Sequence, residues 1–386
     1  AKEQSHLSLK ASFGRAECLA AMRHFDRAER LFSKALTGIT SSQRRERIAR
    51  RFILLADEHL EPSEEQGPPM PARAEQFYRT ALEVGIEGSL AEKTEIKIGR
   101  CLSEQNRHRE AAQYLDGFQE HHEDSPRLAE ALFQAAKSYF DAKYSPAARG
   151  VLRDLLAKFP YSAYAPRAVL LLAKTHGMPS PSSGVDLARG SRALAEFIEK
   201  YPGHKKFQQA RLDLALAPLN AGRHAQAIDS LRKYVQTPGP DDNLASARYH
   251  LGVCLAAQER FEQAAEAWQT YLAKHPAHGF WLQARQGIED MAYKRAEAAW
   301  QREDWVQAAK LYSQFTEKYP AAGRTPDAML RAALAMAKVE KVAEALALLN
   351  TLCSKFPNHP AAASGWFETG RMLEEKRNRF AEARKA

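Results

Sequence analysis

One pattern recurs along the sequence and limits what the chain can fold into. A residue that is mostly aromatic or apolar is followed three positions later by a small residue, inside sequence rich in helix-forming residues. From His108 onward the copies are 36, 43, 37, 37, 44, 37 and 38 residues apart. The copies are Phe25/Ala28, Pro71/Ala74, His108/Ala111, Tyr144/Ala147, Leu187/Gly190, His224/Ala227, Phe261/Ala264, Trp305/Ala308, Val342/Ala345 and Phe380/Ala383. Such a period fits two short antiparallel helices with their turns, repeated about ten times.

Small residues and prolines mark the ends and crossings of these helices. Ala at the start of a second helix lets it approach the first helix closely. About twelve residues earlier a small residue, such as Gly99 or Gly252, stands where the paired helices cross. Pro160 and Pro276 follow about twelve residues after the Ala and end the second helix. We therefore predict an all-α solenoid of about ten antiparallel helix pairs.

The unit from Ala245 to Pro276 carries the marks most completely. Its matching residues are Leu251, Gly252, Leu255, Phe261, Ala264, Trp268, Tyr271 and Pro276. In this order and spacing they resemble the tetratricopeptide repeat, and the resemblance extends over nearly the whole chain. The resemblance implies a right-handed superhelix whose first helices line the inner surface. It also implies a scaffold that binds a protein or peptide, although members of this family bind very different partners.

A seven-residue junction between two predicted helices resembles a smaller group of proteins within this family. Phe159-Pro160-Tyr161-Ser162-Ala163-Tyr164-Ala165, followed by an apolar helix, is similar to a junction of bacterial envelope tetratricopeptide proteins. Outer-membrane assembly lipoproteins and periplasmic cell-division coordinators are examples. The resemblance implies a bacterial periplasm or cell-envelope location, with the cytoplasm as the alternative.

The repeats predict one continuous array over residues 1–386. Breaker-rich segments at 61–71 and 177–184 interrupt two repeats, and we expect mobile loops there. Phe380/Ala383 places the last residues in an unfinished second helix, so we expect a fragment of a longer chain. No apolar run is long enough to span a membrane. The sequence leaves the oligomeric state open.

Signatures of catalysis are missing from the sequence. It contains no phosphate-binding glycine loop, no nucleophile elbow and no zinc-binding His-Glu-x-x-His. Cys18, Cys101 and Cys254 each stand two residues after a crossing residue, so we predict that they are buried packing residues. The expected protein is not an enzyme and has no cofactor and no metal site.

Aromatic residues on two first helices define a candidate binding surface. Its residues are Tyr249, Val253, Tyr293, Glu297 and Trp300, on the side that lines the concave groove in the resembled family. Aromatic side chains give large contact area at low entropic cost, which suits an extended peptide or a partner helix. The alternative is that these residues only pack against neighbouring repeats.

The excess positive charge gathers near the N-terminus. Residues 1–60 hold 12 Lys or Arg against 7 Asp or Glu, in a chain of net charge +9. A predicted helix at 43–60 has Ile48, Phe52 and Leu55 on one side and a basic face opposite. The basic face consists of Arg44, Arg45, Arg47, Arg50 and Arg51. It predicts an alternative function, the binding of nucleic acid or anionic surfaces, or else a solvated helix face. The lack of a regular basic repeat position argues against nucleic acid.

Overall fold

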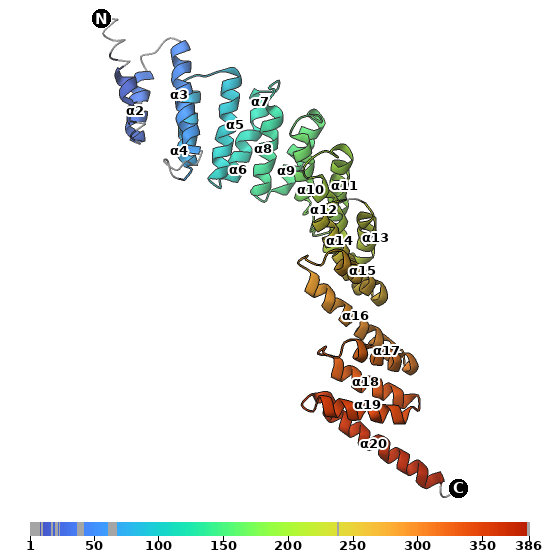
Figure 1. Cartoon of the computed structure of the whole chain (residues 1–386). Coiled ribbons are helices and arrows are strands. Elements are labelled where there is room, and N and C mark those ends of the chain that lie inside the picture. Colours follow the sequence, from blue (N-terminus) through green and yellow to red (C-terminus); the bar gives the residue numbers. More distant parts are fainter. Residues whose placement is uncertain are drawn as a thin grey trace. The chain divides into compact units, whose positions relative to one another are not determined.

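The computed structural model describes residues 8, 11–16, 18–19, 22, 24–36, 42–60, 68–237 and 239–383. All regular secondary structure among these residues is helical, so the all-α prediction is confirmed. Packing divides the chain into two compact units. Figure 1 labels the helices of both. Unit 1 comprises residues 1–178 and 188–204, and unit 2 comprises residues 179–187 and 205–386.

Within each unit, most helices pack against the helix that follows them in the sequence. Those of unit 1 are α2 (Phe25–Leu36), α3 (Ser42–Leu60), α4 (Pro71–Glu83), α5 (Gly88–Glu104), α6 (His108–Asp116), α7 (Phe118–His121), α8 (Leu128–Asp141), α9 (Ser145–Lys158) and α10 (Ala165–Thr175). Helix α11 (Gly184–Lys200) includes residues of both units. Those of unit 2 are α12 (Phe207–Asn220), α13 (His224–Val235), α14 (Asp241–Ala257), α15 (Phe261–Lys274), α16 (Trp281–Gln301), α17 (Trp305–Lys318), α18 (Thr325–Lys338), α19 (Val342–Lys355) and α20 (Pro360–Ala383).

The sequence period locates the starts of the second helices. Helices α6, α13, α15, α17 and α19 begin at the first residue of a predicted pair. The small residue of the pair is then fully buried, as at Ala111, Ala227, Ala264, Ala308 and Ala345. Because an Ala side chain ends at Cβ, the two helix backbones can lie close together along this line. The helix-pair solenoid is therefore confirmed within each unit.

One predicted pair is displaced by a residue. Helix α9 begins at Ser145, and the fully buried small residue is Ala148, whereas Ala147 is only half-buried. Tyr144 is 55% exposed and does not fill the wedge between the helices. The aromatic ring at position 144 misled the alignment, because the turn before α9 fixes the helix start, whatever the size of that residue.

The turns between paired helices share a left-handed residue. Asn106, Lys143, Glu259, Glu303 and Glu340 all have φ between 55° and 62°. Two residues after each, the next helix begins. At the Lys143 turn, the Tyr144 N–H donates to the Tyr139 carbonyl at 2.8 Å, which satisfies an acceptor at the end of α8.

This backbone predicts the effect of substitution at Lys143. Lys143→Gly removes a left-handed penalty of about 1–2 kcal/mol but loses about 0.5–1 kcal/mol to glycine's backbone entropy. We expect a net gain in the free energy of unfolding of less than about 1 kcal/mol in urea denaturation. Lys137→Gly, at an exposed site inside α8, is the control and should cost about 1 kcal/mol. Equal losses from the two variants would contradict the assigned turn.

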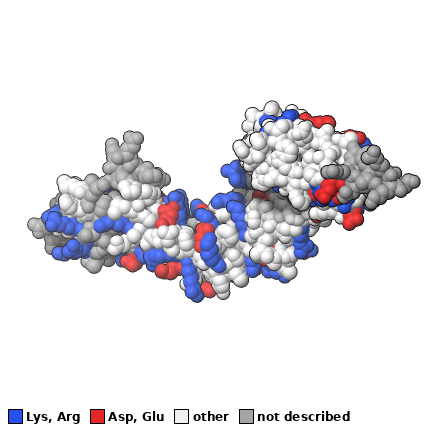
Figure 2. Space-filling view, turned by 90° about the horizontal axis from the view of Figure 1, so that it is seen from below, with Lys and Arg blue, Asp and Glu red and all other residues white. Residues whose placement is uncertain are grey.

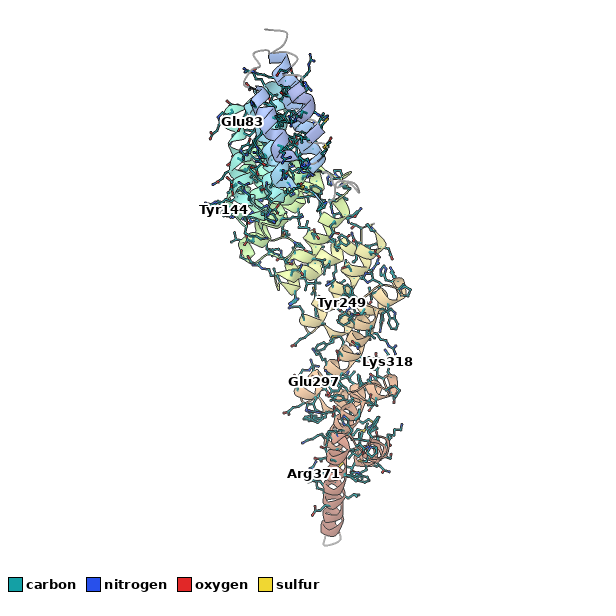
Figure 3. All side chains as sticks on the ribbon, turned by 90° about the vertical axis from the view of Figure 1, so that its left-hand side faces the viewer. Glu83, Tyr144, Tyr249, Glu297, Lys318 and Arg371 are labelled. Atoms are coloured by element: carbon teal, nitrogen blue, oxygen red, sulfur yellow. The ribbon has the colours of Figure 1, made fainter. Side chains whose placement is uncertain are left out.

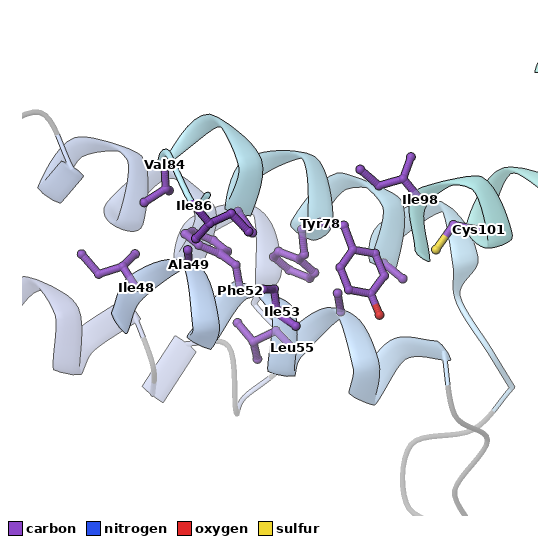
Figure 4. Close-up of a cluster of buried hydrophobic side chains, with 14 of the residues drawn as sticks. Ile48, Ala49, Phe52, Ile53, Leu55, Tyr78, Val84, Ile86, Ile98 and Cys101 are labelled. Carbon is purple, nitrogen blue, oxygen red and sulfur yellow. The ribbon is translucent and has the colours of Figure 1, made fainter. Parts of the chain in front are cut away.

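The core of unit 1 shows how the repeats bury side chains. Phe52 of α3, Tyr78 of α4 and Cys101 of α5 are buried in one cluster (Figure 4). The Tyr78 hydroxyl donates to the Asp57 carboxylate, which also pairs with Lys97. Burial is the main cause that raises the pKa of Tyr78. The cluster thus keeps its one polar end satisfied at the edge of the core.

The cysteine prediction is confirmed at two positions and wrong at a third. Cys101 and Cys254 are buried, and burial raises the pKa of the Cys101 thiol to about 12. Cys18 is exposed although Ala16 beside it is fully buried. At about 100° per residue, Cys18 points away from the side of Ala16.

The structure differs from the sequence at the last predicted pair. Helix α20 continues through Phe380 to Ala383 without a turn, so no second helix begins there. The residues before Phe380 favour helix and include Glu374, Glu375 and Lys376. Of the two predicted loops, residues 61–67 lie outside the described residues, and Gly177–Ser183 connects α10 to α11. Loop mobility and the continuity of the array over residues 1–386 stay predictions.

Candidate functional site

Two first helices of unit 2 carry the predicted groove residues. Tyr249 and Val253 lie on α14, and Tyr293, Glu297 and Trp300 lie on α16. All five side chains are half-buried, so each contacts the stack and also reaches solvent. Tyr249 and Glu297 are labelled in Figure 3. Four of the five belong to two packing groups, Tyr249 and Val253 to one and Tyr293 and Trp300 to the other.

Tyr249 is largely committed to packing. Its ring stacks on Phe280, the residue before α16, with centroids 4.4 Å apart and an interplanar angle of 21°. The Tyr271 ring of α15 lies 5.9 Å away. Burial raises the pKa of the Tyr249 hydroxyl. Tyr249 and the neighbouring Val253 therefore hold one repeat against the next, with part of their surface left for solvent.

Tyr293 and Trp300 stand two helical turns apart on α16. Tyr293 meets Tyr312 and Phe315 of α17 edge to face, with centroids 5.5 and 5.6 Å apart. Trp300 meets Trp305 in the same way at 5.0 Å. Edge-to-face pairs of this kind contribute about 0.5–1.5 kcal/mol beyond their buried area. The second helix thus fixes the orientation of both aromatic rings.

Two arginines that the sequence analysis missed cover these rings. The Arg324 guanidinium lies 4.9 Å from the centroid of Tyr293, and that of Arg331 lies 4.7 Å from the centroid of Trp300. Both belong to the region of α18, the next first helix, and are exposed. Arg324 also pairs with Asp290 at 3.7 Å. A spacing of seven residues separates Tyr293 from Trp300 and Arg324 from Arg331, and this shared spacing was the available signal.

Tyr293, Trp300, Arg324 and Arg331, which we call the aromatic–arginine surface, combine flat apolar area with positive charge. Burial is the main cause that raises the pKa of Tyr293, and Asp327 raises it further. A neutral phenol and two guanidiniums are groups that can hold and orient a ligand by contact and charge. No nucleophile with a paired base is among these four residues.

His250 beside the groove gives stability a dependence on pH. Burial lowers the pKa of His250, while its Nδ1 donates to the Ser246 carbonyl at 2.8 Å. The unfolded chain therefore binds a proton at higher pH than the folded chain, and stability falls as pH drops below about 6.5. Between pH 7.5 and 5.5 we expect the urea midpoint of wild type to fall further than that of His250→Gln. Equal falls would contradict this prediction.

The predicted basic face is exposed on α3. Arg45, Arg47, Arg50 and Arg51 face solvent, and Ile48, Phe52 and Leu55 are buried, so the amphipathic pattern is confirmed. Figure 2 shows Lys and Arg side chains over the N-terminal helices. Arg50 pairs with Glu46 at 2.7 Å, which lowers the net charge of the face. The side chain of Arg44 lies outside the described residues. Binding by this face stays a prediction.

Neither a metal site nor a membrane-spanning helix is evident in the described part of the chain. No three His, Cys, Asp or Glu side chains come together there as metal ligands. His122 pairs with Glu95 at 3.1 Å. None of the helices in these ranges has the length and apolar character needed to cross a bilayer.

Two family models match the sequence. Residues 110–279 match a tetratricopeptide repeat-like domain, and residues 285–385 match an outer membrane lipoprotein family. The first match includes Tyr249 and Val253, and the second includes the aromatic–arginine surface. The predicted repeat family and its likeness to envelope members are confirmed. The envelope likeness lies in the C-terminal part, whereas the junction at Phe159 lies in the other match.

Solved structures with similar folds have low sequence identity. One, of Naa15/Naa10 bound to HypK-THB, has 17% identity and a TM-score of 0.49 and covers 81% of this chain; this chain spans 43% of it. A tetratricopeptide repeat protein from Parabacteroides merdae has 15% identity and a TM-score of 0.36. The match covers 74% of this chain and 99% of that one. The TPR2AB domain of yeast Sti1, in complex with pHSP90, has 16% identity and a TM-score of 0.36. The match covers 74% of this chain and 98% of that one. No curated protein matches the sequence.

Proposed function

We propose, from the premise that this chain is a tetratricopeptide-repeat protein, that it is a non-catalytic scaffold that binds a partner protein or peptide. The binding surface is the first-helix face of unit 2. It includes the aromatic–arginine surface together with Tyr249, Val253 and Glu297. The single observation that supports this proposal is the pairing of Arg324 and Arg331 with the rings of Tyr293 and Trp300.

The composition of this surface is that of a protein interface. Tyr, Trp and Arg are the residues most enriched among those that dominate binding energy. Here the second helix and the neighbouring first helix hold both rings in place, so little conformational entropy is lost when a partner binds. Glu297 adds a half-buried carboxylate between the two rings along α16, which can pair with a basic group of the partner.

We place this scaffold in the bacterial cell envelope. The support is the match of residues 285–385 to an outer membrane lipoprotein family, which covers the aromatic–arginine surface. A partner recovered from the cytoplasm alone would count against this location.

The proposal is tested by partner capture. The immobilised chain is exposed to native lysate at about 150 mM salt and again at high salt, where exposed charge pairs are screened. Retained proteins are identified by mass spectrometry. We expect a protein partner that remains at high salt with wild type and is lost with the Tyr293→Ala/Trp300→Ala double variant.

Two further variants separate binding from folding. The double variant removes half-buried rings, so its helix content and unfolding midpoint are compared with those of wild type. Arg331→Glu changes an exposed side chain and should weaken binding while leaving the unfolding midpoint nearly unchanged. Trp281→Ala, an exposed Trp away from this surface, should bind normally. Nucleic acid or acidic proteins that salt removes, and that depend on Arg47, would support the basic face instead.

A further inference from the structure

A cavity lies on unit 2, on the other side of α14 from Tyr249. It has a volume of about 440 Å³, is open to solvent, and is lined by residues of α13, α14 and α15 and of the turn before α15. Leu251 lines this cavity and is two residues after Tyr249, so at about 100° per residue it points to roughly the opposite side of the helix. The cavity is therefore separate from the proposed groove.

Three arginines from three different elements converge on the cavity. Arg232 comes from α13, Arg248 from α14, and Arg260 from the turn before α15. The lining has a single carboxylate, that of Glu266, which leaves an excess of positive charge. Throughout the described ranges, no carboxylate pairs with any of the three guanidiniums at ion-pair distance. Like charges gathered in this way repel one another, and a bound anion would offset the repulsion.

Neutral groups hold two of these guanidiniums in place. Arg232 Nη2 donates to the Gln263 side-chain oxygen at 3.0 Å. Arg248 Nη1 lies 2.6 Å from Nε2 of His275. A guanidinium can only donate, so Nε2 accepts and the imidazole carries its proton on Nδ1. Nδ1 then donates to Asp241 at 3.1 Å.

His275 is almost fully buried, so this chain of bonds orients Arg248 without neutralising it. Arg260 also lines the cavity and is exposed. Its guanidinium has no hydrogen-bond or ion-pair partner in the described part of the chain. The cavity is thus lined by two guanidiniums that neutral side chains hold in place and by a third without such a partner. Val235 and Leu251 add a half-buried apolar wall.

We propose that this cavity is a binding site for a multiply charged oxyanion, a phosphate or polycarboxylate group, held by Arg232, Arg248 and Arg260. The planar fork of each guanidinium matches two oxygens of such a group. The open mouth admits the anion either free or attached to a larger organic molecule, whose apolar part would contact Val235 and Leu251. The site does not depend on the proposed partner groove.

Calorimetric titration of the intact chain at low salt tests the site. The probes are inorganic pyrophosphate, citrate, inorganic phosphate and phenyl phosphate. We expect saturable one-to-one binding of pyrophosphate or citrate, weakened about tenfold by Arg260→Gln and also by Arg232→Gln. Tighter binding of phenyl phosphate than of inorganic phosphate would identify an organic anion as the ligand, and equal binding would identify the free anion.

The control is Arg302→Gln, an exposed arginine outside the cavity that changes the net charge by the same amount. It should leave the affinity within about twofold, since a single distant charge is largely screened. The absence of saturable binding of every probe would overturn the proposal. So would an equal loss with Arg302→Gln, because the anions would then respond only to net charge.

Discussion

Replacing Trp268 with Ala should lower the free energy of unfolding of unit 2 by about 3–5 kcal/mol, the range for large aromatic deletions from a core. The indole is only 5% exposed and lies between α14 and α16. Its Nε1 donates to the Tyr249 carbonyl at 3.0 Å. Removal therefore leaves a cavity shared by three helices and also a carbonyl without its indole donor.

Urea denaturation followed by fluorescence and far-ultraviolet circular dichroism measures this loss. All five tryptophans lie in unit 2, so the remaining four report on that unit. The matched control is Trp281→Ala, because Trp281 is 37% exposed and should cost no more than about 1 kcal/mol. Similar losses for the two variants would mean that Trp268 does not hold the three helices together.

Gly252→Ala should cost about 1–3 kcal/mol, although Ala normally favours a helix. A Cβ at this position would lie 2.6 Å from Cδ1 of Trp268. The indole has no room to withdraw, because a Cβ built at Gly287 on α16 would lie 2.6 Å from its Cζ3. Two glycines on successive first helices thus form the slot that accepts this one side chain.

A double-mutant cycle tests this slot directly. In the Trp268→Ala background the clash is gone, so Gly252→Ala should become neutral or stabilising by up to about 1 kcal/mol. The same urea denaturation gives all four free energies. Additive losses would show that the cost of Gly252→Ala has another origin.

The repeat period was readable from sequence because it reflects a steric requirement. Only a small side chain fits where two helix backbones approach, so Ala264 and Ala308 recur at the same phase and are fully buried. The prediction was wrong by one residue at Ala147, because the left-handed turn at Lys143 sets the start of α9. It also failed at Cys18, which is exposed although Ala16 is fully buried.

The candidate site was predictable only in part. Helical phase places Tyr293 and Trp300 on one side of α16, and the structure keeps them half-buried there. Phase does not reveal which side chains of the next repeat reach over them, so Arg331 was missed. The stacking of Tyr249 on Phe280 was also hidden, since it depends on the turn between α15 and α16.

Groove and core share residues in unit 2, which bears on how binding affects stability. The Tyr249 carbonyl accepts from Trp268, while the Tyr249 ring borders the predicted groove. One repeat later, the ring of Tyr293 likewise borders the predicted groove and packs against the buried ring of Tyr312. A partner that presses on these rings would also stabilise the helix packing beneath them.

Site-specific photo-cross-linking tests the scaffold claim most directly. A photoreactive phenylalanine analogue replaces Glu297 on the groove side of α16 or, in the control, Gln314 on the exposed side of α17. We predict that a partner protein is cross-linked at position 297 and not at 314, and that Arg331→Glu removes the product. Cross-linking at 314 alone, or equally at both positions, would contradict a partner held on the first-helix face.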